Sequence, residues 1–162
     1  MMPMNDPVRE QIIKLLQGGQ AHLTLDAVLK NFPPRLRGLK PAGAPHSAWQ
    51  LLEHLRIAQW DILEFSRSAK HVSPKWPEGY WPSSDRPPTD AAWKKCISAI
   101  KRDCREMQKL VENPRTDLYS KIPHGTGQNI LREALLIADH NAYHIGQLML
   151  VRRLLGAWQE DS

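Results

Sequence analysis

The 162-residue chain has only two cysteines, Cys96 and Cys104. They lie eight residues apart in a stretch that reads as one helix, so a rise of about 1.5 Å per residue separates their Cα atoms by about 12 Å. That distance is too long for a disulfide. We therefore expect two free thiols in a reducing compartment, and a cytoplasmic protein.

Long apolar runs are also missing. No window approaches the ~18 unbroken apolar residues of a membrane-spanning helix. The first residues, MMPMNDPVREQ, contain no apolar run of signal-peptide length. We expect neither a membrane span nor a secretory signal.

Basic residues outnumber acidic ones, but they are not clustered along the sequence. There are 22 Lys and Arg residues against 17 Asp and Glu, which gives a net charge of +5. No basic run exceeds two residues, and no basic stripe alternates with stacking aromatics, so we expect no nucleic-acid partner. With 41% apolar and 24% charged residues, the chain is predicted to form a single globular domain over residues 1–162.

Signals for β-strands are scarce, because apolar and polar residues never alternate for long and β-branched residues are sparse. Apolar residues recur with helical spacing instead. We expect a helix from Asp6-Pro7 to Gly18-Gly19, a shorter one within residues 21–32, and long helices over residues 46–69, 90–113 and 126–158, the last with Thr126 as N-cap. Four long amphipathic helices predict an all-α four-helix bundle.

The last expected helix is apolar almost all round. Ala138 and Ile145 lie roughly opposite Leu136 and Leu154 on a helical wheel. A helix with two apolar faces is either central or at a subunit interface. We expect a homodimer.

Residues 70–89, KHVSPKWPEGYWPSSDRPPT, form a long proline-rich loop with three large aromatic side chains, Trp76, Tyr80 and Trp81. Loops of this length are uncommon in compact domains and are often functional. Two interpretations remain open. The aromatics either pin the loop onto the bundle or cover a pocket.

The segment ADHNAYHIGQ, residues 138–147, sets His140 and His144 four residues apart in the last expected helix. Such residues have Cβ atoms about 5–6 Å apart, so both imidazoles could bind one metal ion. On the helical wheel they share the face of Leu148 and Val151, which points into the bundle.

A third histidine, His54, occupies the apolar stripe of another helix between Leu51 and Ala58. Buried imidazoles without partners would each cost roughly 1–3 kcal/mol, so the three either bind a metal or form a hydrogen-bonded cluster. Three neutral histidines suit zinc, nickel or iron and leave positions for water or substrate. A metalloprotease of the HExxH type is not expected, because Asn141 stands where that motif needs Glu.

Four further polar residues share the inward faces. Glu133 and Gln147 lie on the side of the histidine pair, and Gln50 and Asp61 lie on the side of His54. Each either orients a ligand imidazole, acts as an acid or base, or is solvated at a bundle end. The remaining histidines are expected outside the site: His46 at a helix start, His124 in a turn, and His22 and His71 on the surface.

The segments HSAWQLLEHLRIAQWDIL and LREALLIADHNAYHIGQLMLVRRLLG carry a resemblance to the DinB-like family of the DinB/YfiT-type metal proteins. The first is similar to the family's second-helix motif with its single metal histidine, and the second to its last-helix motif with a paired HxxxH. The order and spacing of the helices fit over nearly the whole chain. The resemblance implies a four-helix bundle, a divalent metal held by His54, His140 and His144, and a dimer.

The resemblance also implies a class of reaction. Some relatives are thiol-dependent transferases or isomerases that use bacillithiol, mycothiol or glutathione. We expect a metal-dependent enzyme acting on a small molecule, with thiol-dependent S-transfer first and hydrolysis next; Asp61 and Glu133 are the candidate bases for hydrolysis. The alternative is a non-catalytic stress-response protein in which the ion is structural.

Overall fold

The structure, a computed structural model, describes residues 6–158. Four longer helices make up the bundle: α1 (Pro7–Gln17), α3 (Ala48–Arg67), α4 (Asp90–Glu112) and α5 (Ile130–Leu154). A short helix, α2 (Leu25–Leu29), and two 3-10 turns, Pro34–Leu36 and Glu78–Tyr80, complete the helical elements. Over the described residues, β structure is limited to one isolated bridge between Lys121 and Asn129. The all-α expectation is confirmed.

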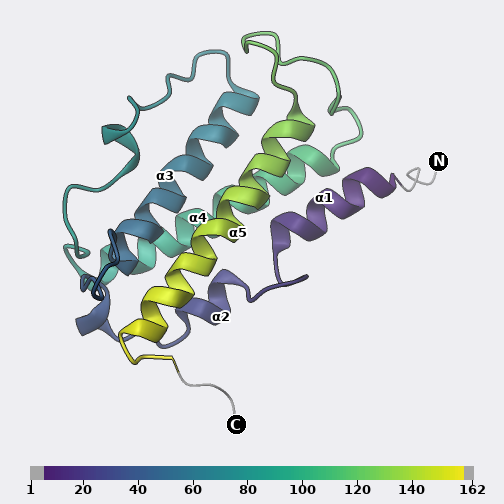
Figure 1. The fold of residues 1–162 in the computed structure, drawn as a ribbon. Helices are drawn as coiled ribbons and strands as arrows, with labels where there is room; N and C mark the ends of the chain where they lie inside the picture. The colour runs from purple at the N-terminus through teal and green to yellow at the C-terminus, as the bar shows by residue number, and fades with distance from the viewer. Residues whose placement is uncertain (1–5, 159–162) are drawn as a thin grey trace.

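The helices α3 and α5 run side by side in opposite directions, with α4 behind them (Figure 1). The helix α1 packs against α4 and α5. The connection between α3 and α4, residues 68–89, passes along the outer side of α3. None of the helices formed by residues 6–158 is both long and apolar enough to cross a membrane.

Side-chain caps explain where the helices begin. In each α-helix the residue before the first turn accepts a hydrogen bond from a backbone N–H of that turn, which otherwise has no partner. These caps are Asp6, Thr24, Ser47, Thr89 and Asn129. At α3 the cap is reciprocal, because Gln50 Oε1 accepts from the backbone of Ser47. The expected helices over 21–32 and 46–69 are therefore shorter than their apolar patterns suggested.

The expected start of the last helix at Thr126 is wrong. The backbone of Ile122 bonds to Gln128 at 2.8 Å, and Gly127 has a φ of +132°, so this segment forms a turn. The cap is Asn129, whose Oδ1 accepts from the backbone of Arg132 at 2.8 Å. Thr and Asn are both good caps, so the apolar pattern alone could not choose between them.

Replacing Asn129 with Ala should lower the unfolding free energy by about 1 kcal/mol, because the first turn of α5 loses its acceptor. The matched variant Thr126→Ala should change it by less than about 0.5 kcal/mol, since Thr126 is exposed and caps no helix. Urea denaturation of both variants measures the difference. Equal losses would show that Asn129 is not the functional cap.

Two apolar clusters fill the bundle, one towards each end. The first joins α2 to the first halves of α3 and α4 and the second half of α5, and the other joins α1 to the remaining halves. Between them lies a polar layer. Gln59 of α3 donates to the carbonyl of Ile100 at 2.7 Å and accepts from Asn141 Nδ2 at 2.8 Å. The residue that replaces the HExxH glutamate therefore joins α5 to α3.

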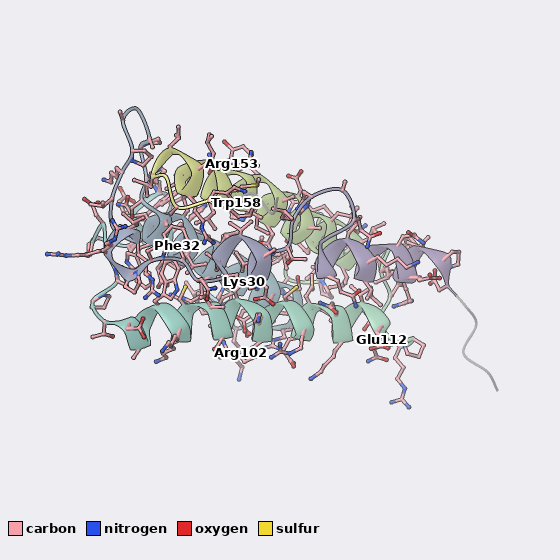
Figure 2. All side chains as sticks on the ribbon, turned by 90° about the horizontal axis from the view of Figure 1, so that it is seen from below. Lys30, Phe32, Arg102, Glu112, Arg153 and Trp158 are labelled. Carbon is pink, nitrogen blue, oxygen red and sulfur yellow. The ribbon has the colours of Figure 1, made fainter. Side chains whose placement is uncertain are left out.

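The end of α5 is held by a buried arginine. Arg152 donates to the carbonyls of Val28, at 2.6 Å, and Ala157, at 2.9 Å. Its guanidinium lies 5.2 Å from the ring centre of Phe32 and 5.4 Å from that of Trp158; Figure 2 shows both rings near this end of the helix. These contacts fix α2 against α5.

The unusual apolar surface of α5 has a structural explanation, because the helix packs against α1, α2, α3 and α4. It is therefore central to the bundle, one of the two alternatives that its pattern allowed. Two leucines near its end, Leu150 and Leu154, are nevertheless each 57% exposed.

Candidate metal centre

Three histidines meet where α3 faces α5. His54 projects from the first half of α3, and His140 and His144 project one turn apart from α5. One nitrogen of each ring lies within 4.8 Å of one nitrogen of the other two. His54 and His144 are buried, and His140 is half-buried.

Hydrogen bonds fix the tautomers of two rings. His54 Nδ1 donates to the carbonyl oxygen of Tyr80 at 2.9 Å, and His144 Nδ1 donates to Gln147 Oε1 at 2.6 Å. Because both partners are acceptors, each Nδ1 carries the proton and each Nε2 keeps its lone pair. Bonds of this kind orient imidazole ligands in metal sites.

The third ring is the one without such support. His140 Nε2 lies 3.1 Å from His54 Nε2, and His140 Nδ1 is buried without a hydrogen-bond partner. Two nitrogens at this distance must share a proton or a cation. Tetrahedral bonds of about 2.0–2.1 Å from one ion would separate its nitrogen ligands by about 3.4 Å. The three histidines therefore fit a divalent ion and could hold one.

Burial keeps the cluster neutral. It is the largest cause that lowers the pKa of His140 to about 3, with the neighbouring imidazoles adding repulsion. Burial also lowers the pKa of His144 to about 4, against the opposing bond to Gln147. The pKa of His54 is lowered for the same reason, although its bond to Tyr80 opposes the shift. Neutral imidazoles are the form that binds metals.

The metal-free protein should lose stability as the pH falls below about 6.5. There the unfolded chain, with histidine pKa values near 6.5, binds protons that the folded protein does not. The unfolding free energy should fall by roughly 1.4 kcal/mol per pH unit for each histidine that stays neutral when folded. The loss continues to about pH 4, where His144 begins to titrate in the folded state.

Urea denaturation of chelator-treated protein at pH 7, 6 and 5 measures this slope. His140→Gln should reduce it, whereas His22→Gln, at an exposed position, should leave it unchanged. A slope that is the same in all three proteins would show that the cluster does not carry the effect.

The histidine cluster borders an open cavity of about 620 Å³. The outer wall of this cavity comes from the loop between α3 and α4, through Trp76, Tyr80 and Trp81. Trp81 stacks flat on His54, with 3.9 Å between ring centres, and on its other face it stacks on His46 at 4.0 Å. The loop aromatics therefore both pin the loop and cover the cavity, so the two interpretations of the sequence hold together.

A buried carboxylate fixes the same loop to α3. Asp61 Oδ1 accepts from His71 Nε2 at 2.7 Å, and Asp61 Oδ2 accepts from the hydroxyl of Tyr80 at 2.6 Å. The surface position expected for His71 is wrong, because only 8% of its side chain is exposed. Burial, followed by the bond to Asp61, raises the pKa of Tyr80 to about 12. Asp61 lines the cavity, but both of its oxygens are engaged.

The other polar candidates are placed differently. Gln147 lines the cavity and bonds to His144. Gln50 lies in the capping box of α3 and donates to Asp85 at 2.9 Å, so it helps to hold the end of the loop. Glu133 is buried beside Arg132, whose Nη1 lies 2.7 Å from it, and it does not line the cavity. Of the four, the structure brings Asp61 and Gln147 to the histidine cavity.

Sequence patterns missed His46 and His71 as neighbours of this cavity. Both lie outside the long helices, in segments without periodicity, and they reach the site through a ring stack and a hydrogen bond. The proximity of His46 to Trp81 in space could not be read from positions 35 residues apart. Two other expectations do hold: His22 is exposed, and His124 lies in the turn before α5. Both cysteines are free.

Comparison with protein families matches residues 19–148 to the model described as the DinB superfamily. The chain belongs to the DinB superfamily. The DinB match covers α2, α3, α4 and most of α5, and therefore the whole histidine cluster, while α1 precedes it. Comparisons with curated proteins and with solved structures gave no match.

Proposed function

We propose that this DinB-superfamily chain is a metal-dependent enzyme that transfers a low-molecular-weight thiol to a small organic electrophile, with hydrolysis as the next candidate. The observation that supports it best is that His54, His140 and His144 border an open cavity of about 620 Å³. Catalytic zinc sites typically combine three protein ligands with one open position, whereas structural sites are closed by four.

The three histidines would hold the ion, which we propose to be zinc, nickel or iron. Such an ion lowers the pKa of a coordinated thiol or water to near neutral pH. The chain contributes orientation: Tyr80 and Gln147 hold the rings of His54 and His144 through their Nδ1 protons. The stack of Trp81 on His54 covers one face of that imidazole.

The state of Asp61 favours a thiol over water as nucleophile. Attack by water is usually assisted by a general base, and Asp61 is the carboxylate that the described residues bring to the cavity wall. Both of its oxygens already accept hydrogen bonds from His71 and Tyr80. A thiolate needs no general base once its proton has been lost. S-transfer therefore requires no free carboxylate in the cavity, whereas hydrolysis usually does.

The test uses zinc-loaded protein with 1-chloro-2,4-dinitrobenzene and, in turn, bacillithiol, mycothiol and glutathione. In this reaction a sulfur–carbon bond forms, chloride leaves with the electron pair of the broken bond, and the thiol proton passes to solvent. Hydrolysis of 4-nitrophenyl acetate is measured in parallel. We expect turnover with at least one thiol that falls at least about 100-fold in His140→Ala and persists in the surface control His124→Ala.

A chain that binds metal stoichiometrically but turns over neither thiol nor ester would contradict the enzymatic proposal. The result would favour the alternative, a non-catalytic metal-binding stress-response protein in which the ion stabilises the bundle. Faster ester hydrolysis without thiol than thiol transfer would reverse the ranking of the two reactions.

The homodimer remains a proposal, supported by the exposed leucines of α5. Leu150 and Leu154 lie one turn apart, each 57% exposed, and a second copy packing there would remove both from water. Light scattering during gel filtration should give twice the chain mass for wild type and the chain mass for Leu150→Glu. A monomeric wild type would contradict the proposal.

A further inference from the structure

No lysine or arginine lines the cavity beside the histidines, although the chain carries a net charge of +5. The chain has 22 Lys and Arg residues, all within the described residues 6–158, and none of them lines this cavity. The carboxylate in its wall, Asp61, is already bonded to His71 and Tyr80. Away from the proposed ion, an anionic substrate would therefore find no basic side chain in the cavity wall to pair with, which is costly in a partly buried site.

Aromatic and aliphatic side chains make up much of the remaining wall. Tyr80 and Trp81 are engaged in holding the loop, through Asp61 and the histidine stack. Trp76 and Tyr143 border the same cavity, yet they are 67% and 64% exposed. Each ring contacts one neighbour, with 5.4 Å between the ring centres of Trp76 and Tyr80 and 4.9 Å between those of Tyr143 and His144. Most of each side chain is nevertheless exposed and can contact a bound molecule.

We propose that the organic substrate is an uncharged, ring-containing molecule that packs against Trp76 and Tyr143 beside the histidine cluster, an inference that rests on the proposed function. A cavity of about 620 Å³ is within the usual range for ligands of one or two fused rings with substituents. Half-buried Ile62 and Leu136 add apolar surface to the same wall.

The test compares two probes of similar shape, naphthalene-2-carboxamide, which is neutral, and naphthalene-2-sulfonate, a weakly coordinating anion. Isothermal titration calorimetry is carried out with zinc-loaded and with chelator-treated protein. We expect the carboxamide to bind at least about 10-fold more tightly than the sulfonate in the chelator-treated protein, where no ion adds positive charge beside the wall.

Variants locate the binding. Trp76→Ala and Tyr143→Ala should each weaken carboxamide binding about 5-fold or more, since a stacked ring pair is lost. Tyr119→Ala is the matched control, because Tyr119 is 60% exposed and lies away from the cavity; its affinity should equal that of wild type. Tyr143→Lys should raise sulfonate affinity by supplying the missing positive charge.

Sulfonate binding that equals or exceeds carboxamide binding in chelator-treated wild type would overturn the proposal, as would equal effects of Tyr143→Ala and Tyr119→Ala. Metal analysis of the same preparations separates this failure from that of the proposed function. Carboxamide selectivity in a chain that binds no metal would retain the inference about the cavity and contradict the metal-dependent enzyme.

Discussion

Purified His140→Ala should contain less than about a tenth of an ion per chain, whereas wild type prepared in parallel should contain about one. Loss of one of three ligands leaves two imidazoles, and even the loss of a residue that only orients a ligand typically lowers metal affinity 10–100-fold. We expect the affinity of His140→Ala to fall well beyond that range. Elemental analysis, followed by competition with a chromophoric chelator, measures both quantities.

Two comparisons sharpen this result. Gln147→Ala keeps all three histidines but removes the acceptor that orients His144, so its affinity should fall by about 10–100-fold, less than that of His140→Ala. His124→Ala removes an exposed histidine and should bind metal as wild type does. If wild type and His140→Ala contained the same substoichiometric metal, the assignment of the triad would be wrong.

Asp61→Ala should lower the unfolding free energy by about 2–4 kcal/mol and release the loop over the cavity. The variant leaves His71 and the hydroxyl of Tyr80 without their shared acceptor, and each unsatisfied buried group costs about 1–3 kcal/mol. In a domain of this size the melting temperature should fall by roughly 4–15 °C. Calorimetry gives the melting temperature, and limited proteolysis within residues 68–89 reports the release of the loop.

Single-partner variants divide this effect. Tyr80→Phe and His71→Ala each remove one donor to Asp61 and should each destabilise less than Asp61→Ala. Their effects should not add to that of Asp61→Ala in double variants, because the three groups act together. An Asp61→Ala protein with wild-type stability and an uncut loop would show that Asp61 does not hold the loop.

The helical architecture was largely predictable because it depends on local signals. Apolar spacing gave the four longer helices, and cap chemistry placed the start of α1 at Asp6. The predicted start of α5 at Thr126 is wrong, because the turn around Gly127 depends on a backbone hydrogen bond between Ile122 and Gln128. Contacts of that kind arise from the tertiary fold and leave little trace in periodicity.

In the candidate site, too, the residues on helices were predictable and the contacts of the loop were not. His54, His140 and His144 lie at helical positions whose faces can be deduced from the sequence, and the structure does bring them together. Other contacts depend on the path of an irregular loop. These are the hydrogen bond from His71 to Asp61 and the stacking of Trp81 on His46 and His54. Residue spacing carries no information about that path, so the sequence could offer only alternatives for the loop.

The most direct test of a shared cation is a crystal structure of the zinc-loaded protein with diffraction measured on both sides of the zinc absorption edge. An anomalous peak about 2.0–2.1 Å from one nitrogen each of His54, His140 and His144 is the predicted result. A stoichiometric zinc peak elsewhere on the chain, or no peak between α3 and α5 in protein that analysis shows to contain zinc, would contradict the account.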